Sequence, residues 1–150
     1  MDVGERLSAD LHDAMRKGDV LRREMIRMLR TALHYEEIAR RGPLDEAATI
    51  EVLQRETKKR QEALELFRQG RRQDLVDKAE GEIAIIAGYL PQPLAADEIE
   101  ALARDAVAEA GADNPKQMGQ VMKLLMPRVR GRADGRALSE LVKKLLSETG

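Results

Sequence analysis

The last third of the chain, Gln117–Leu146, places the strongest constraint on the fold. Its apolar residues recur in two runs, each at the spacing of one helix face, which predicts two helices. The first run is Met118, Val121, Met122 and Leu125, and the second is Leu138, Leu141, Val142, Leu145 and Leu146. Pro127, Gly131 and Gly135 interrupt the pattern between the runs, so we expect a sharp turn there. Asp134 stands where the N-cap of the final helix belongs.

The same helical periodicity, broken by glycine and proline, continues through the rest of the chain. Apolar side chains make up 43% of the residues, but there are only two Tyr, one Phe and no Trp. A core of aliphatic residues and Met favours a helical over a β-rich protein. We therefore predict an all-α protein with two bundles, an N-terminal four-helix bundle with long helices and a C-terminal three-helix bundle. The expected domains are residues 1–90 and 96–150, joined by a linker at 91–95, because Pro91-Gln92-Pro93 prevents a helix from continuing.

N-cap residues, glycines and prolines predict the helix ends. Helices are expected over Val3–Lys17, from the cap Asp19 to Arg41, from the cap Asp45 to Gln69, from just after Asp74 to Leu90, over Asp97–Ala110, and from the cap Asn114 onward. The second helix should bury one apolar stripe, made of Leu21, Met25, Met28, Leu29, Ala32, Tyr35 and Ala39.

The third helix has a polar waist at Thr57, Arg60 and Gln61. We expect the stem of Arg60 to lie on the core and its charged head to stay in water. The alternative is that this helix leaves its bundle or lines a groove.

A charge gradient underlies the net charge of −1. Residues 91–111 hold 1 basic and 5 acidic side chains, whereas residues 112–150 hold 8 basic and 4 acidic ones, a net +4. Arg128, Arg130, Arg132 and Arg136 surround the expected start of the final helix, and a helix start beside guanidinium groups suits a phosphate. Alternatively, Arg128, Arg130 and Arg132 pair within the domain with Asp97, Glu98 and Glu100.

A second basic row is expected on the second helix, opposite its apolar stripe. Its members are Arg23, Arg27, Arg30, His34 and Arg41. Such a row of side chains could bind the phosphates of a nucleic acid. The alternative is that it is an ordinary solvent-exposed helix face.

The sequence contains few residues or motifs that are typical of catalytic sites. The two histidines, His12 and His34, have no metalloprotease spacing, no cysteine is present, and no nucleophile elbow or phosphate-binding loop occurs. His34 and Glu37 could touch one metal, but a third ligand is not evident, so we predict no metal site, no catalytic residue and no cofactor.

The chain has too few aromatic residues to stack the bases of a single strand. If it binds a nucleic acid, we therefore expect it to contact the phosphates of a folded RNA. No apolar run reaches the length of a membrane span and no signal segment is evident, so we expect a cytoplasmic protein.

The final stretch resembles the signature of the GatB/YqeY domain, in the letters MGQVMKLLMPRVRGRADGRALSELVKKLL. The stretches RLSADLHDAMRKGD and GRRQDLVDKAEGEIAIIAGYLPQPL are similar to the YqeY proteins, which stand alone. The resemblance spans nearly the whole chain and implies the same two helical bundles. In GatB, the B subunit of glutamyl/aspartyl-tRNA amidotransferase, this module is a C-terminal tail that helps to engage tRNA.

The resemblance therefore implies contact with tRNA, through the tail bundle in particular. It assigns structural roles to Gly119, in close helix packing, and to Gly131, in a turn, and it makes Arg132, Lys143 and Lys144 candidates for RNA contact. The catalytic part of GatB has no counterpart here. The leading hypothesis is a tRNA-binding accessory module that is not catalytic by itself. Its rivals are an interaction adaptor for an aminoacyl-tRNA synthetase or amidotransferase, and a subunit in glutamine-dependent carbon-nitrogen ligase activity.

Overall fold

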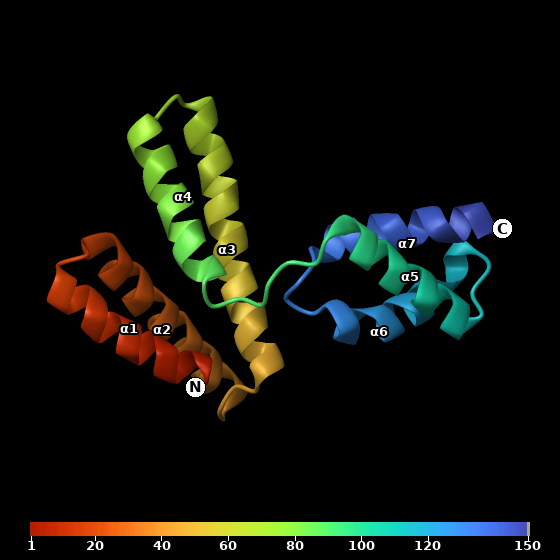
Figure 1. Cartoon of the computed structure of the whole chain (residues 1–150), viewed down its shortest axis with the longest axis horizontal. Coiled ribbons are helices and arrows are strands. Elements are labelled where there is room, and N and C mark those ends of the chain that lie inside the picture. Colours follow the sequence, from red (N-terminus) through yellow and green to blue (C-terminus); the bar gives the residue numbers. More distant parts are fainter. Residues whose placement is uncertain (150) are drawn as a thin grey trace. The chain divides into compact units, whose positions relative to one another are not determined.

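The computed structural model describes residues 1–149 and is all-α, with no strand among them (Figure 1). Its elements are α1 (Val3–Lys17), α2 (Val20–Arg40), α3 (Glu46–Gln69), α4 (Gln73–Ala87), α5 (Ala96–Ala110), the 3-10 turn η1 (Pro115–Gln117), α6 (Met118–Val129) and α7 (Gly135–Thr149). This confirms the predicted fold class. The chain divides into two compact units, Met1–Pro91 with α1–α4 and a second unit that begins at Gln92 with α5–α7.

Short acidic side chains set the starts of the first three helices. The carboxylates of Asp2, Asp19 and Asp45 accept hydrogen bonds from the backbone N–H three residues on, at 2.8, 3.2 and 2.8 Å. Gly18 ends α1 in the left-handed region, with φ of 67°, where a side chain would be strained. The predicted helix over Val3–Lys17 and the caps Asp19 and Asp45 are confirmed.

Several predicted helix ends were misplaced. α4 ends at Ala87 and not at Leu90, and Asn114 caps the 3-10 turn η1, so α6 begins only at Met118. α4 begins at Gln73, so Asp74 lies inside its first turn, where its carboxylate pairs with Arg72 at 3.2 Å instead of capping the helix. α6 continues through Pro127 to Val129. Pro127 is exposed and lies in the last turn of α6, where its missing N–H leaves the Lys123 carbonyl without that donor, and only two helical residues follow it. The turn is made beyond it, where Gly131 has φ of 75°.

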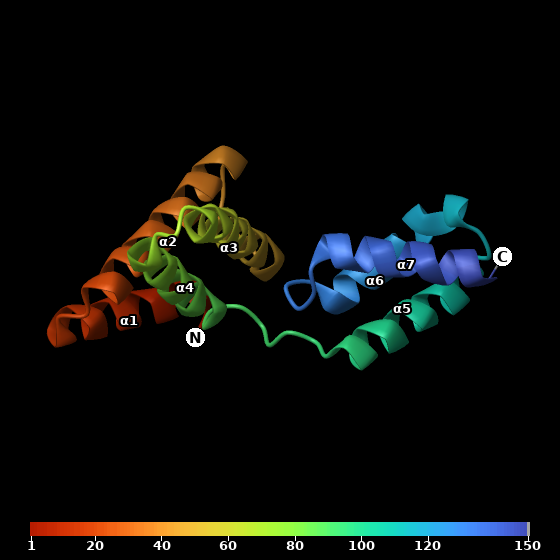
Figure 2. The same ribbon diagram turned by 90° about the horizontal axis from the view of Figure 1, so that it is seen from above.

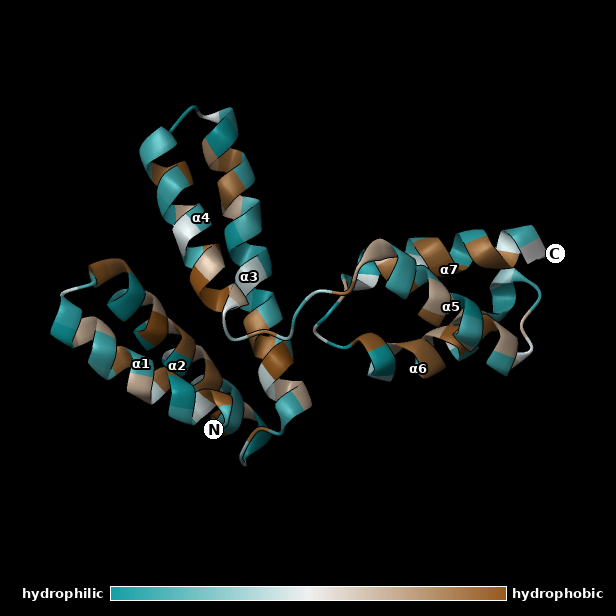
Figure 3. Ribbon diagram, viewed as in Figure 1, coloured by the Kyte–Doolittle hydropathy of each residue, from teal (hydrophilic) through white to brown (hydrophobic). Residues whose placement is uncertain are grey.

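The main core of the first unit lies where α1, α2, the first half of α3 and the end of α4 meet. Its most deeply buried side chains are Leu7, Met25, Ile26, Leu29, Leu53 and Ile86. A separate small cluster of Leu64, Val76 and Ala79, with Phe67 and Ile83 against it, holds α3 and α4 together farther along. These two helices lie side by side in both views (Figures 1 and 2). Each helix alternates hydrophobic and hydrophilic faces, as burial of one stripe requires (Figure 3).

Arg60 lies between the two clusters, and its charged head is buried, contrary to the prediction that it stays in water. The residue is only 9% exposed. One amino group donates to the Glu56 carboxylate and to the Glu56 carbonyl, both at 2.9 Å, and the other donates to the Met28 sulfur. Nε of Arg60 lies 3.8 Å from the Glu82 carboxylate and has no hydrogen-bond acceptor among the described residues. Within the polar waist, Arg60 therefore forms an internal ion cluster with Glu56 and Glu82 and also contacts Met28 of α2, whereas Gln61 is exposed.

The buried face of α2 is rotated from the predicted stripe. Met25, Ile26, Leu29 and Leu33 are buried, whereas Met28 is 50% exposed and Tyr35 is 68% exposed. Ala39 is exposed as well. The reason is that α2 packs against both α1 and the α3–α4 pair, so its contact direction is set by two neighbours at once.

The second unit is a three-helix bundle with one core. Its buried residues are Ala103, Ala106, Val107, Ala112, Val121, Leu125, Val129, Leu138, Val142, Leu145 and Leu146. Two of the three buried residues of α5 are alanines, Ala103 and Ala106, so the other two helices can approach α5 closely there. The Asp134 carboxylate accepts from the N–H of Ala137 at 3.3 Å and so caps α7. A Cβ at Gly119 would meet nothing within 4 Å, so this glycine is not required for close helix packing.

Candidate nucleic-acid interface

The arginine-rich joint between α6 and α7 is not one open cluster. Arg128 forms an ion pair with Glu109 of α5, which is an internal pairing, although not with the predicted acids. Nε of Arg132 donates to the carbonyl of Gln92 at 2.9 Å, and the carbonyl of Arg132 accepts from the N–H of Leu94 at 2.9 Å. Arg132 therefore fastens the segment before α5 onto the α6–α7 turn. A guanidinium engaged in this way has fewer donors to offer a phosphate.

The other cations of this surface are open to solvent. Arg130, Lys143 and Lys144 are exposed and form no ion pair within the described residues. The side chain of Arg136 is 89% exposed, and its nearest carboxylate, on Glu140, is 3.7 Å away, which is a weak contact. We call Arg130, Arg136, Lys143 and Lys144 the α7 cation set.

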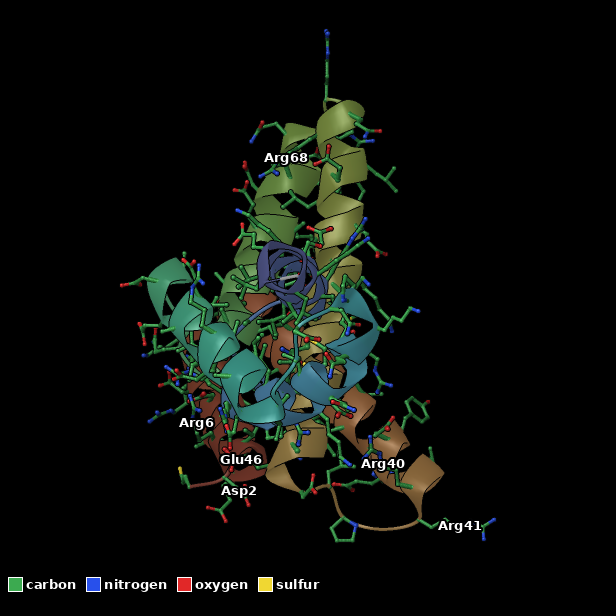
Figure 4. All side chains as sticks on the ribbon, turned by 90° about the vertical axis from the view of Figure 1, so that its right-hand side faces the viewer. Asp2, Arg6, Arg40, Arg41, Glu46 and Arg68 are labelled. Atoms are coloured by element: carbon green, nitrogen blue, oxygen red, sulfur yellow. The ribbon has the colours of Figure 1, made fainter. Side chains whose placement is uncertain are left out.

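The basic row predicted on α2 is partly neutralised by one acid that the sequence reasoning overlooked. Glu24 pairs with Arg23 at 3.0 Å and with Arg27 at 3.6 Å. Arg30 is exposed and has no ion pair among the described residues, and Arg41 extends away from the end of α2 (Figure 4). His34 lies 4.0 Å from Glu37 and is exposed. The row is thus a weaker phosphate track than its residue types predict.

Arg22, which we did not predict, anchors a polar network that locks α1 onto α2. It pairs with Asp13 at 2.7 Å and with Asp10 at 3.3 Å. The hydrogen bonds from Arg22 and then Lys17 hold the pKa of Asp13 down at about 2. Tyr89, 7% exposed, donates its hydroxyl to Asp10, and burial together with that bond raises its pKa. Part of this network could be predicted from the sequence, because Asp13 stands three and four residues before Arg16 and Lys17 on α1. The contact between Asp10 and Tyr89 could not, because the two residues are far apart in the chain.

A pocket of about 850 Å³ opens in the first unit beside the start of α1 and the end of α2. Its polar lining includes Asp2, Arg6 and Glu46 (Figure 4). Arg6 is already engaged: it donates to the carbonyl of Gly88 at 2.7 Å and lies 5.0 Å from the centre of the Tyr89 ring. These side chains provide no nucleophile with an adjacent base. Across residues 1–149 we find no trio of His, Asp or Glu side chains arranged to hold a metal ion.

None of the helices described is both long and apolar enough to cross a membrane.

Comparison with known proteins places the chain in a family. The model of the family described as Yqey-like protein matches residues 4–146. The chain is 36% identical over 118 residues to a protein of Lachancea thermotolerans, and 28% identical over 145 residues to one of Pyrenophora tritici-repentis. Both are named "Altered inheritance of mitochondria protein 41, mitochondrial".

Coverage of these relatives is unequal. The two alignments take in 77% and 95% of this chain, and 63% and 78% of the respective relatives. A protein of the same name from Saccharomyces cerevisiae is 30% identical over 95 residues, 63% of this chain, and the match spans 51% of that relative. Because the family match extends over both helical units, the chain belongs to the YqeY-like protein family.

Proposed function

We propose that the protein is an accessory module that contacts folded tRNA through the outer surface of α7 and the adjoining α6–α7 turn, without catalysing a reaction by itself. The observation that carries the proposal is the α7 cation set: four cations within 15 residues, exposed and unpaired except for the weak contact of Arg136. Exposed cations can exchange their counterions for phosphates, which is the main source of affinity for nucleic acids.

The distribution of acids in the second unit supports this proposal. Two acids of α5 are occupied by arginines, since Glu100 pairs with Arg104 at 2.8 Å and Glu109 pairs with Arg128. The acids of 91–111 are thus concentrated on α5, whereas the net +4 of residues 112–150 belongs to α6, α7 and their connections. Because α5 is net negative and the rest of the unit is net positive, the bundle has a preferred orientation of approach to a polyanion.

The resemblance of the tail to GatB supports tRNA as the RNA, because the tail of GatB serves in a tRNA-dependent enzyme. The relatives' names state a mitochondrial location for those proteins and no ligand. For this chain a cytoplasmic location stays part of the proposal. A fluorescent fusion at the chain's C-terminus, imaged in its own cells, tests it.

The test is a mobility-shift titration of the whole chain with bulk tRNA. Replacing Lys143 and Lys144 together by Ala should weaken binding at least fivefold at about 100 mM salt. The matched control replaces Lys58 and Lys78 by Ala. These two lysines are also exposed and without an ion pair in the described chain, but they lie on α3 and α4. Equal loss in both double variants would show that only total charge matters and would defeat the assignment to α7.

The rival functions predict different results. An adaptor for a synthetase or an amidotransferase would retain that protein in a pull-down after nuclease treatment, with no measurable affinity for tRNA. A subunit of a glutamine-dependent carbon-nitrogen ligase would support amidation of Glu-tRNA when added to the remaining subunits. We expect no amidation from the purified chain alone.

A further inference from the structure

The large apolar side chains that remain exposed are concentrated on α2. Of the seven such residues among those described, Val20, Met28, Tyr35 and Ile38 lie on this helix. Met28, Tyr35 and Ile38 are 50%, 68% and 59% exposed. With Thr31, also exposed, they have spacings of three, four and three residues, which is the a and d pattern of a helix that packs along another helix. We call Met28, Thr31, Tyr35 and Ile38 the α2 seam.

The seam has a different border on each side. Toward α3 lie Glu36 and Arg40, which are bound to Arg55 and Glu51 at 2.9 and 3.2 Å, so this side is closed by the protein itself. On the opposite side lie Arg27 and His34, both exposed, at the positions that flank a and d in a heptad. Arg23 and Arg30 continue this basic side around the helix. Glu24 offsets part of this charge by pairing with Arg23 and Arg27 at 3.0 and 3.6 Å, and Glu37 lies 4.0 Å from His34. Because Arg23, Arg27 and Arg30 outnumber Glu24, the open approach to the seam keeps a net positive charge.

We propose that the α2 seam binds an amphipathic helix of a protein partner whose apolar stripe is bordered by Asp or Glu. The seam supplies exposed side chains, three of them apolar, at helical spacing, and the basic border attracts acidic side chains of the incoming helix. From Met28 to Ile38 the seam is about 15 Å long, which is enough for roughly three turns of a partner helix.

Two other occupants fit the same surface less well. If the two-fold axis crosses α2, a second copy sets this helix antiparallel to itself and brings the flank with Arg27 against the same flank of its partner. If the axis runs along α2, that flank faces Ala32 and Ala39, so neither arrangement gives Arg27 an opposite charge. RNA is also a poor fit, because the seam offers only one aromatic ring, Tyr35, on which a base could stack. The side chains of Met28 and Ile38 do not donate hydrogen bonds to a base or a phosphate.

The test uses two synthetic helical peptides of about three heptads, each with Leu at positions a and d. The acidic peptide carries Glu at the e and g positions and the basic peptide carries Lys there. Their binding to the whole chain is measured by fluorescence anisotropy at about 150 mM salt, where distant charges are screened. We expect the acidic peptide to bind at least tenfold more tightly than the basic one.

Variants locate the binding on the molecule. Tyr35→Ser should weaken binding of the acidic peptide at least fivefold. Leu66→Ser is the matched control, because Leu66 on α3 is 66% exposed but lies outside the seam, and it should leave binding unchanged. The Lys143→Ala/Lys144→Ala variant should also leave peptide binding unchanged, so this inference and the tRNA proposal can fail separately.

Four outcomes would overturn the inference. The first is that the basic peptide binds as tightly as the acidic one. The second is that Tyr35→Ser leaves peptide binding unchanged. The third is that Tyr35→Ser weakens tRNA binding fivefold and Leu66→Ser does not, which would assign the seam to RNA. The fourth is that sedimentation shows a dimer that Tyr35→Ser dissociates, which would assign it to a second copy.

Discussion

Removal of the buried guanidinium of Arg60 gives the most informative test of how the first unit is held together. Arg60→Ala leaves the Glu56 and Glu82 side chains, 13% and 21% exposed, without their main counter-charge. Breaking a buried ion pair by removing one partner costs about 3–5 kcal/mol. Because both carboxylates retain some contact with water, we expect the lower end of that range, a loss of about 3 kcal/mol in the free energy of unfolding.

The pH dependence of this loss follows from Glu56. Burial raises the pKa of this carboxyl, but hydrogen bonds from Arg60 and Lys59 outweigh burial, and its pKa lies below the ordinary value. A lowered folded-state pKa contributes stability that is present above the unfolded-state pKa of about 4.3 and is lost as the pH falls through the folded value. The difference between Arg60→Ala and the parent protein should therefore be full at about pH 7 and shrink below about pH 4.

Tyrosine fluorescence during urea unfolding is the assay. Both tyrosines, Tyr35 and Tyr89, belong to the first unit and the second unit has no aromatic residue, so the signal reports the first unit alone. Arg55→Ala is the matched control: this arginine on the same helix pairs with Glu36 but is 59% exposed, and its loss should cost under about 1 kcal/mol. Equal effects of the two substitutions, or a loss from Arg60→Ala that does not change between neutral and acidic pH, would refute the reasoning.

Three further substitutions or measurements test other parts of the structure. Tyr89→Phe removes the hydroxyl that donates to Asp10 and should lower the free energy of unfolding by about 1–2 kcal/mol, as seen by far-ultraviolet circular dichroism in urea; an unchanged midpoint would contradict the contact. Asp134→Ala removes the cap of α7 and should cost the second unit about 1 kcal/mol, whereas Asp134→Asn should retain most of the stability. The Asp13 carboxyl, followed by NMR, should titrate near pH 2; its stabilising effect is present above the unfolded-state pKa and lost as the pH falls through about 2, and a normal titration would exclude the Arg22 pair.

The sequence was sufficient to predict the helices because local signals agree with one another. Asp19 and Asp45 cap helices whose apolar periodicity starts just after them, and Gly18 ends a helix whose last turn is basic. Local signals failed where two neighbours compete for one helix. The periodicity of α2 shows that Met28 and Tyr35 lie near its apolar side, but only the packing of α1 and α3 decides which part of that side is buried.

The residue types of the candidate site could be predicted from the sequence, but which of its arginines form ion pairs or hydrogen bonds within the protein could not. Arg128 and Arg132 belong to the same short sequence as Arg130. In the structure, however, Arg128 pairs with Glu109 of α5, and Arg132 donates to the carbonyl of Gln92. Those partners are distant in sequence, so spacing along the chain cannot identify them. The burial of Arg60 is partly a similar case: Glu56 lies four residues earlier on the same helix, but Glu82 and Met28, which also contact Arg60, come from α4 and α2.

The salt dependence of tRNA binding tests the central claim most directly. Each neutralised phosphate contributes about 0.7 to 0.9 to the slope of log affinity against log salt concentration, the values for single strands and for duplex DNA. The slope should be steep for the whole chain and should fall by about two to four when Arg130, Arg136, Lys143 and Lys144 are all replaced by Ala. Circular dichroism must show that this variant retains the helical content of the parent. An unchanged slope and affinity in that folded variant would contradict the account and leave α7 without a role in RNA contact.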